Sequence, residues 1–87
     1  MIDVRTPLEF EQGHLKYAKN IDFKSEHFQS EISKLDKNKP VYLYCRSGNR
    51  SGKAELSLKE WGFLLPTNIG GFVELTQKGL PIATKEN

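Results

Sequence analysis

Short apolar runs alternate with segments of helical spacing along this chain. Residues 2–4 and 41–44 are predicted strands, and the second run is apolar throughout, as a central parallel strand requires. Residues 67–69 are expected to form the last strand, and residues 20–23 a brief extended piece. Strands that alternate with helices predict β-α units around a parallel sheet.

Four helices are predicted between and after these strands. Thr6, Pro7 and Glu9 have the order of an N-cap, a first helical position and a capping-box glutamate, and Gly13 is expected to end this short helix. Ser25 is expected to cap the second helix. The apolar stripes that should face the core are Phe28, Ile32 and Leu35 in the second helix, Ala54, Leu58 and Trp61 in the third, and Phe72 and Leu75 in a short fourth helix.

Length and charge bound the class of protein. The 87 residues suffice for one small domain over residues 1–83, and residues 84–87 are expected to fray. A net charge of +2, carried by interspersed residues of both signs, predicts neither a nucleic-acid partner nor binding to an anionic membrane surface. No apolar run approaches the roughly 20 residues of a membrane-spanning helix. We expect a monomer.

The segment Cys45-Arg46-Ser47-Gly48-Asn49-Arg50 lies between the strand 41–44 and a predicted helix, and it holds the only cysteine of the chain. Loop amides and the positive end of the helix dipole, about half an elementary charge, favour a thiolate at this position. Arg46 and Arg50 add two charges that can hold an anionic substrate beside the sulfur. A buried structural cysteine is the alternative, but two arginines, a glycine and a helix within this segment favour a reactive site.

Short motifs lie on both sides of this loop. They are Ile2-Asp3-Val4-Arg5, Gly13-His14-Leu15 with Ala18 and Asn20-Ile21, Trp61-Gly62-Phe63, Gly70-Gly71-Phe72 and Gly79-Leu80-Pro81. Together with the loop they resemble the motifs of the rhodanese family of sulfurtransferases. The resemblance covers nearly the whole chain, although Tyr17 replaces the glycine of the family's "GA" pair and Leu75 replaces an aromatic residue. It implies a small three-layer α/β domain with a parallel sheet flanked by helices, similar to the short phage-shock-protein E type and without the strand and helix that generally precede "DVR".

This resemblance implies sulfur transfer in two steps. Cys45 would attack the outer sulfur of thiosulfate or a similar small anionic donor, sulfite would leave, and the persulfide on Cys45 would pass its sulfur to cyanide or a thiol. Arg50, and to a lesser degree Arg46, should bind the sulfonate oxygens through paired N–H donors. The amides of residues 46–50 should surround the terminal sulfur. Substrate binding is therefore expected from Arg46, Ser47, Gly48, Asn49 and Arg50.

Four other residues are expected to support the site. Asp3 and Arg5 should form a structural ion pair or hydrogen bonds near the strand end, since thiosulfate transfer needs no general acid. His14 is expected to stabilise a turn more than to act in catalysis, and Ser51 to donate to the loop or cap the following helix. No cofactor is expected, and no metal site either, because the two histidines and the cysteine lack the spacing of ligands.

Three alternative functions remain open at this stage. A cysteine phosphatase or arsenate reductase has five residues between its cysteine and arginine, whereas four separate Cys45 from Arg50, which removes roughly 3.3 Å of chain. A persulfide carrier would hand the sulfur to a protein acceptor. A non-enzymatic interaction module would have the fold without the activity, which the presence of Cys45 and Arg50 disfavours. Two cellular compartments fit the sequence. They are the cytoplasm and, if an upstream signal peptide is missing from this chain, the periplasm.

Overall fold

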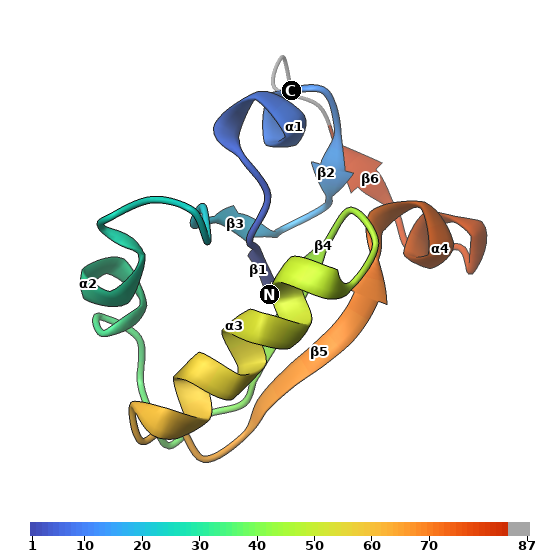
Figure 1. Ribbon diagram of the computed structural model, residues 1–87. Helices are drawn as coiled ribbons and strands as arrows, with labels where there is room; N and C mark the ends of the chain where they lie inside the picture. The colour runs from blue at the N-terminus through green and yellow to red at the C-terminus, as the bar shows by residue number, and fades with distance from the viewer. Residues whose placement is uncertain (84–87) are drawn as a thin grey trace.

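A sheet of four parallel strands lies at the centre of the computed structural model, which describes residues 1–83. Residues 84–87, which were expected to fray, lie outside the described residues. The strands follow the order β3-β1-β4-β5 across the sheet (Figure 1). They are Ile2–Asp3 (β1), Lys19–Asn20 (β3), Val41–Cys45 (β4) and Pro66–Gly71 (β5). The predicted α/β fold with a parallel sheet flanked by helices is confirmed.

Four helices follow the strands along the described chain, in the predicted order. They are Pro7–Glu11 (α1), Phe28–Ile32 (α2), Asn49–Glu60 (α3) and Phe72–Gln77 (α4). The capping box of α1 is confirmed, because the Thr6 hydroxyl accepts from the Glu9 amide while the Glu9 carboxylate accepts from the Thr6 amide. Figure 1 shows α3 lying across β4 and β5. Each helix within residues 1–83 is too short or too polar to span a membrane.

The start of α2 corrects the prediction made for Ser25. The helix begins at Phe28, its N-cap is His27, and no side chain caps it. The Ser25 hydroxyl instead accepts a hydrogen bond from the His27 amide at 3.0 Å, within the turn that precedes the helix. Serine favours both arrangements through the same local bond to a nearby amide, so its presence alone did not locate the first helical turn.

A second, two-stranded sheet was not predicted. His14–Leu15 (β2) pairs antiparallel with Ile82–Ala83 (β6). The expectation that residues 67–69 form the last strand is therefore wrong, because β6 follows β5 in the chain. Strands of two residues show no periodicity of their own, and their pairing depends on contacts between the two ends of the domain.

The side chains of β4 alternate between two hydrophobic clusters. Val41, Leu43 and Cys45 point into the larger cluster, which includes the buried apolar residues of α2 and α3. Tyr44 points to the opposite face and packs in the smaller cluster with side chains of β2 and α4. Tyr42, on that same face, is 47% exposed, so the sheet is covered there only near the carboxyl end of β4. The alternation places the sulfur of Cys45 on the side of the sheet where α3 begins.

The residue in the family's "GA" glycine position has the backbone conformation of a glycine. Tyr17 has a φ of 72°, and among the described residues it is the one non-glycine residue with positive φ. Its ring is 86% exposed, so its packing contributes little. A left-handed conformation costs an L-residue roughly 1–2 kcal/mol, which explains why a glycine suits this turn.

Candidate active site

Cys45 is the last residue of β4, and its side chain is fully buried. The chain turns at Gly48, whose φ of 96° suits glycine, and α3 begins at the next residue. This turn points the Gly48 amide at the sulfur, with 3.0 Å between nitrogen and Sγ. The position at a strand end and a helix start, predicted from the sequence, is thus the one observed.

The surroundings of Cys45 favour its anionic form. Burial by itself raises the pKa of the Cys45 thiol, but hydrogen bonds from the Ser51 hydroxyl and from the amides of Ser51, Gly48 and Ser47 outweigh it and hold the pKa below its ordinary value. The first residues of α3 also bring the positive end of the helix dipole to the sulfur. These donors are the chemical basis of a thiolate nucleophile.

A side-chain network behind the sulfur controls the Ser51 hydroxyl. Its Oγ lies 3.4 Å from Cys45 Sγ and 2.7 Å from Asn68 Oδ1, yet a hydroxyl carries one proton. The Asn68 amide is oriented by a donated bond to the Gly48 carbonyl (3.1 Å) and a bond accepted from the Gly70 amide (3.0 Å). When the thiol is neutral, the hydroxyl can donate to Asn68. When the thiolate forms, the hydroxyl can turn to the sulfur, because Asn68 Oδ1 keeps the Gly70 amide as a donor.

The loop packs against the end of β5 with no room for a side chain there. A Cβ placed on Gly71 would lie 2.5 Å from the Arg46 carbonyl oxygen and 3.0 Å from the Ser47 Cα. Such contacts are far inside van der Waals distance, so the loop holds this shape only against a glycine. Gly71 therefore positions the loop in addition to being the N-cap of α4.

Both N–H prongs of the Arg50 guanidinium bind a carboxylate of α1. The two NH groups of Arg50 donate to Glu9 Oε1 at 2.8 Å and Oε2 at 3.1 Å. The bonds from Arg50, aided by the Thr6 amide and hydroxyl against the opposing effect of burial, lower the pKa of Glu9 to about 2. In return, the bond with Glu9 raises the pKa of Arg50. The role of Arg50 in donor binding stays a prediction, and in this structure its fork is already occupied.

The other loop arginine, Arg46, follows Cys45 directly and lines a surface hollow. Arg46 is exposed, and within residues 1–83 no carboxylate pairs with its guanidinium. A hollow of about 260 Å³ beside it is lined by the side chains of Glu9, Gln12 and Phe72 among others. Ser47 on the same loop and Asn49, the first residue of α3, are also exposed. The hollow next to the loop is therefore lined by both polar and apolar side chains, and Arg46 is a cation at its edge without a carboxylate partner in the described chain.

The predicted supporting residues lie on the strand and turn beside the loop. Asp3 and Arg5 are buried and form an ion pair with Arg5 NH2 2.7 Å from Asp3 Oδ2, and the same NH2 group donates to the Gly13 carbonyl at 2.7 Å. His14 Nδ1 lies 2.9 Å from the Phe10 carbonyl oxygen, and its ring stacks on the Phe10 ring with centroids 3.6 Å apart. These contacts fit the structural roles expected for all three residues.

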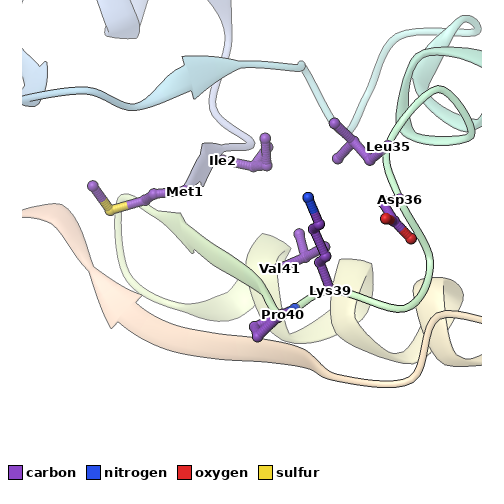
Figure 2. Close-up of a pocket in the computed structure, with 7 residues that line it drawn as sticks. All are labelled: Met1, Ile2, Leu35, Asp36, Lys39, Pro40 and Val41. Carbon is purple, nitrogen blue, oxygen red and sulfur yellow. The ribbon is translucent and has the colours of Figure 1, made fainter.

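A second hollow lies at the opposite end of the sheet (Figure 2). It has a volume of about 180 Å³ and is lined by residues at the start of β1 and β4, among them Ile2 and Val41. Figure 2 shows the Lys39 side chain reaching up beside Val41. Because β4 runs from Val41 to Cys45, this hollow is roughly 13 Å from the cysteine and belongs to a different part of the surface.

Two residues that contact the loop were missed from the sequence. Glu9 was assigned to the capping box alone, and its bond to Arg50 joins positions 41 residues apart. Asn68 was assigned to a strand without a role at the site. A polar amide within a predicted strand was the available signal for Asn68, whereas no local signal existed for Glu9.

Comparison with known proteins gives a consistent result. The profile of the Rhodanese-like domain family matches residues 1–78. The uncharacterized protein YqhL of Bacillus subtilis (strain 168) is 41% identical over 73 residues, which are 83% of this chain and 56% of that protein. Thiosulfate sulfurtransferase PspE of Escherichia coli (strain K12) is 36% identical over 74 residues, 85% of this chain and 71% of that protein.

A solved structure described as a rhodanese with anions from E. coli has the same fold. It superposes with a TM-score of 0.79 at 34% sequence identity, covering 95% of this chain and 94% of that chain. The chain spans little more than half the length of YqhL.

Proposed function

Because the chain belongs to the rhodanese family, we propose that it is a thiosulfate sulfurtransferase working through a persulfide on Cys45. Its relatives support a role in sulfur transfer. We add to this that thiosulfate is the donor and that cyanide or a thiol is the acceptor. The observation that carries the proposal is the set of hydrogen bonds that holds the pKa of the Cys45 thiol low at the start of α3. A soft thiolate in an amide cradle suits attack on a sulfane sulfur.

The first half-reaction forms the persulfide. The Cys45 thiolate attacks the outer sulfur of thiosulfate, a new sulfur–sulfur bond forms, and the bond to the sulfonate sulfur breaks with its electron pair leaving on sulfite. No proton is required, since sulfite leaves as an anion. The amides that surround Cys45 Sγ would then stabilise the persulfide anion, whose charge lies on the outer sulfur.

The second half-reaction regenerates the thiolate. A thiolate acceptor, or cyanide, attacks the outer sulfur of the persulfide, and the electron pair of the broken bond returns to Cys45 Sγ. Arg46, exposed and unpaired in the described chain, would make the first contact with the sulfonate oxygens of the donor. Arg50 would join it only after releasing Glu9.

Intact mass spectrometry of the purified chain tests the proposal. Treatment with thiosulfate should add one sulfur atom to the wild type, and a subsequent excess of cyanide or a small thiol should remove it. Cys45→Ser should gain nothing, because a hydroxyl at this position has no base to activate it. A wild type that stays unmodified while it hydrolyses an aryl phosphate would establish phosphatase chemistry instead. Persulfide that forms but resists every small acceptor would favour a carrier for a protein acceptor.

A further inference from the structure

The carboxylate of Glu9 is held at the loop independently of Arg50. Its Oε1 accepts from the Thr6 amide at 3.0 Å and from the Thr6 hydroxyl at 3.1 Å, so the capping box of α1 fixes it in place. From this position it meets both NH groups of Arg50. The side chains of Arg50 and Glu9 are only 20% and 26% exposed, which places the pair largely out of bulk water. Charge-assisted, two-pronged pairs of this kind are among the stronger hydrogen-bonded contacts in proteins.

We propose that Glu9 is a specificity-determining residue, an internal counterion that an anionic donor has to displace from Arg50. The expected effect of Glu9 on thiosulfate turnover rests on the proposed function. The competition of Glu9 with other anions for Arg50 does not depend on sulfur transfer. It gives the two loop arginines different roles. Arg46 offers an exposed positive charge next to Cys45 in the chain, and Arg50 offers one only to a donor that competes successfully with Glu9.

The geometry explains why this competition matters. Glu9 is already anchored by Thr6, so binding Arg50 orders little further chain, whereas a free anion loses its translational and rotational freedom. Its pKa of about 2 keeps it charged at any pH where the protein would work. The loop therefore discriminates against weakly held monoanions and favours donors with enough charge, or enough additional contacts, to displace a carboxylate.

The same carboxylate acts on the nucleophile. The charge of Arg50 interacts electrostatically with Cys45, and the opposite charge of Glu9 weakens the field that Arg50 exerts on the sulfur. Removing the charge of Glu9 should therefore raise the local concentration of anions at Cys45 as well as free the guanidinium. If the Glu9 carboxylate served the capping box alone, removing its charge would have neither effect.

Alkylation of the single cysteine measures this effect without any sulfur transfer. The probes are iodoacetate, an anion, and iodoacetamide, its neutral counterpart, and the measured quantity is the ratio of their rates with Cys45. Both reagents must reach the same buried sulfur, so limited access cancels in the ratio. Glu9→Gln keeps the length and the carbonyl oxygen that accepts from the Thr6 amide, and it should raise the ratio about two- to five-fold at low salt.

A matched control removes the same charge far from the loop. Glu60 is exposed at the last turn of α3, ten residues beyond Arg50 and so about 15 Å along the helix. Glu60→Gln should leave the ratio unchanged. Arg50→Gln leaves Glu9 unpaired and should lower the ratio, and the double variant Glu9→Gln/Arg50→Gln should return it close to that of the wild type.

The outcomes separate this inference from the proposed function. A folded Glu9→Gln variant with an unchanged ratio would overturn the role of Glu9. If that variant does not fold, Arg50→Gln, which leaves the cap of α1 intact, decides the question, and an unchanged ratio there also overturns it. With persulfide formation established, Glu9→Gln should lower KM for thiosulfate more than it changes kcat. A raised ratio in a protein that never forms a persulfide would sustain Glu9 as counterion and refute the sulfurtransferase.

Discussion

Replacing Ser51 with alanine tests whether a single hydroxyl holds the thiolate. In the anionic state the hydroxyl is the side-chain donor to Cys45 Sγ, 3.4 Å away in the structure, beside the backbone amides. A hydrogen bond to a charged group contributes about 1.5–3 kcal/mol, and the hydroxyl gives up its bond to Asn68, worth about 0.5–1.5 kcal/mol, when it turns. The net contribution is about 1–2 kcal/mol.

This magnitude corresponds to about one pKa unit, since one unit equals about 1.4 kcal/mol. The direction follows from the sign of the interaction. The hydroxyl stabilises the charged form, so its loss should raise the pKa of Cys45. At a pH well below the wild-type pKa, the thiolate fraction should then fall about ten-fold. Persulfide formation from thiosulfate should slow by a similar factor.

The assay is the rate of alkylation by iodoacetamide as a function of pH, which reports on the one cysteine of the chain. Ser57→Ala, at a serine later in the same helix, controls for the loss of a hydroxyl elsewhere in α3. A midpoint that moves by less than about 0.3 units in Ser51→Ala, in a protein that melts like the wild type, would refute the reasoning. The backbone amides alone would then hold the thiolate.

Three further predictions follow from the same contacts. Gly71→Ala should lower the free energy of unfolding by about 1–3 kcal/mol in urea titrations and slow alkylation, because its Cβ would lie 2.5 Å from the Arg46 carbonyl; a fully stable, active variant would contradict the close packing. Asp3→Asn should cost about 3–5 kcal/mol by the same titration, since it leaves Arg5 buried without a counter-charge, and a loss below about 1 kcal/mol would contradict this. The folded-state pKa of Glu9, about 2, lies below the ordinary 4.5, so its ion pair stabilises the fold fully above about pH 4.5 and loses this effect as the pH falls toward 2. The difference in unfolding free energy between wild type and Glu9→Gln should therefore shrink over that range. A difference that stays constant would refute this prediction.

Features that depend on neighbours in the chain were predictable. The capping box of α1 uses residues three apart, and the apolar stripe of α3 repeats every turn, so both are visible in the sequence and both are observed. The loop after Cys45 was located for the same reason, because a strand, a glycine with positive φ and a helix start follow one another directly. Where two local patterns compete, as at Ser25, the boundary of a helix was placed too early.

Features that depend on distant segments were decided by the tertiary structure. The pairing of β2 with β6, the contact of Asn68 with Ser51 and the ion pair of Glu9 with Arg50 join positions 17 to about 70 residues apart. A hydrogen bond or an ion pair specifies its partner by position in space and leaves no spacing rule in the sequence. The sequence by itself therefore determined the order of the four helices and of the parallel strands between them, and it placed Cys45 between a strand and a helix. Only the packing of α1 and β5 against the loop determined that Arg50 has a carboxylate partner while Arg46 has none among residues 1–83. That arrangement exists only once those elements are brought together.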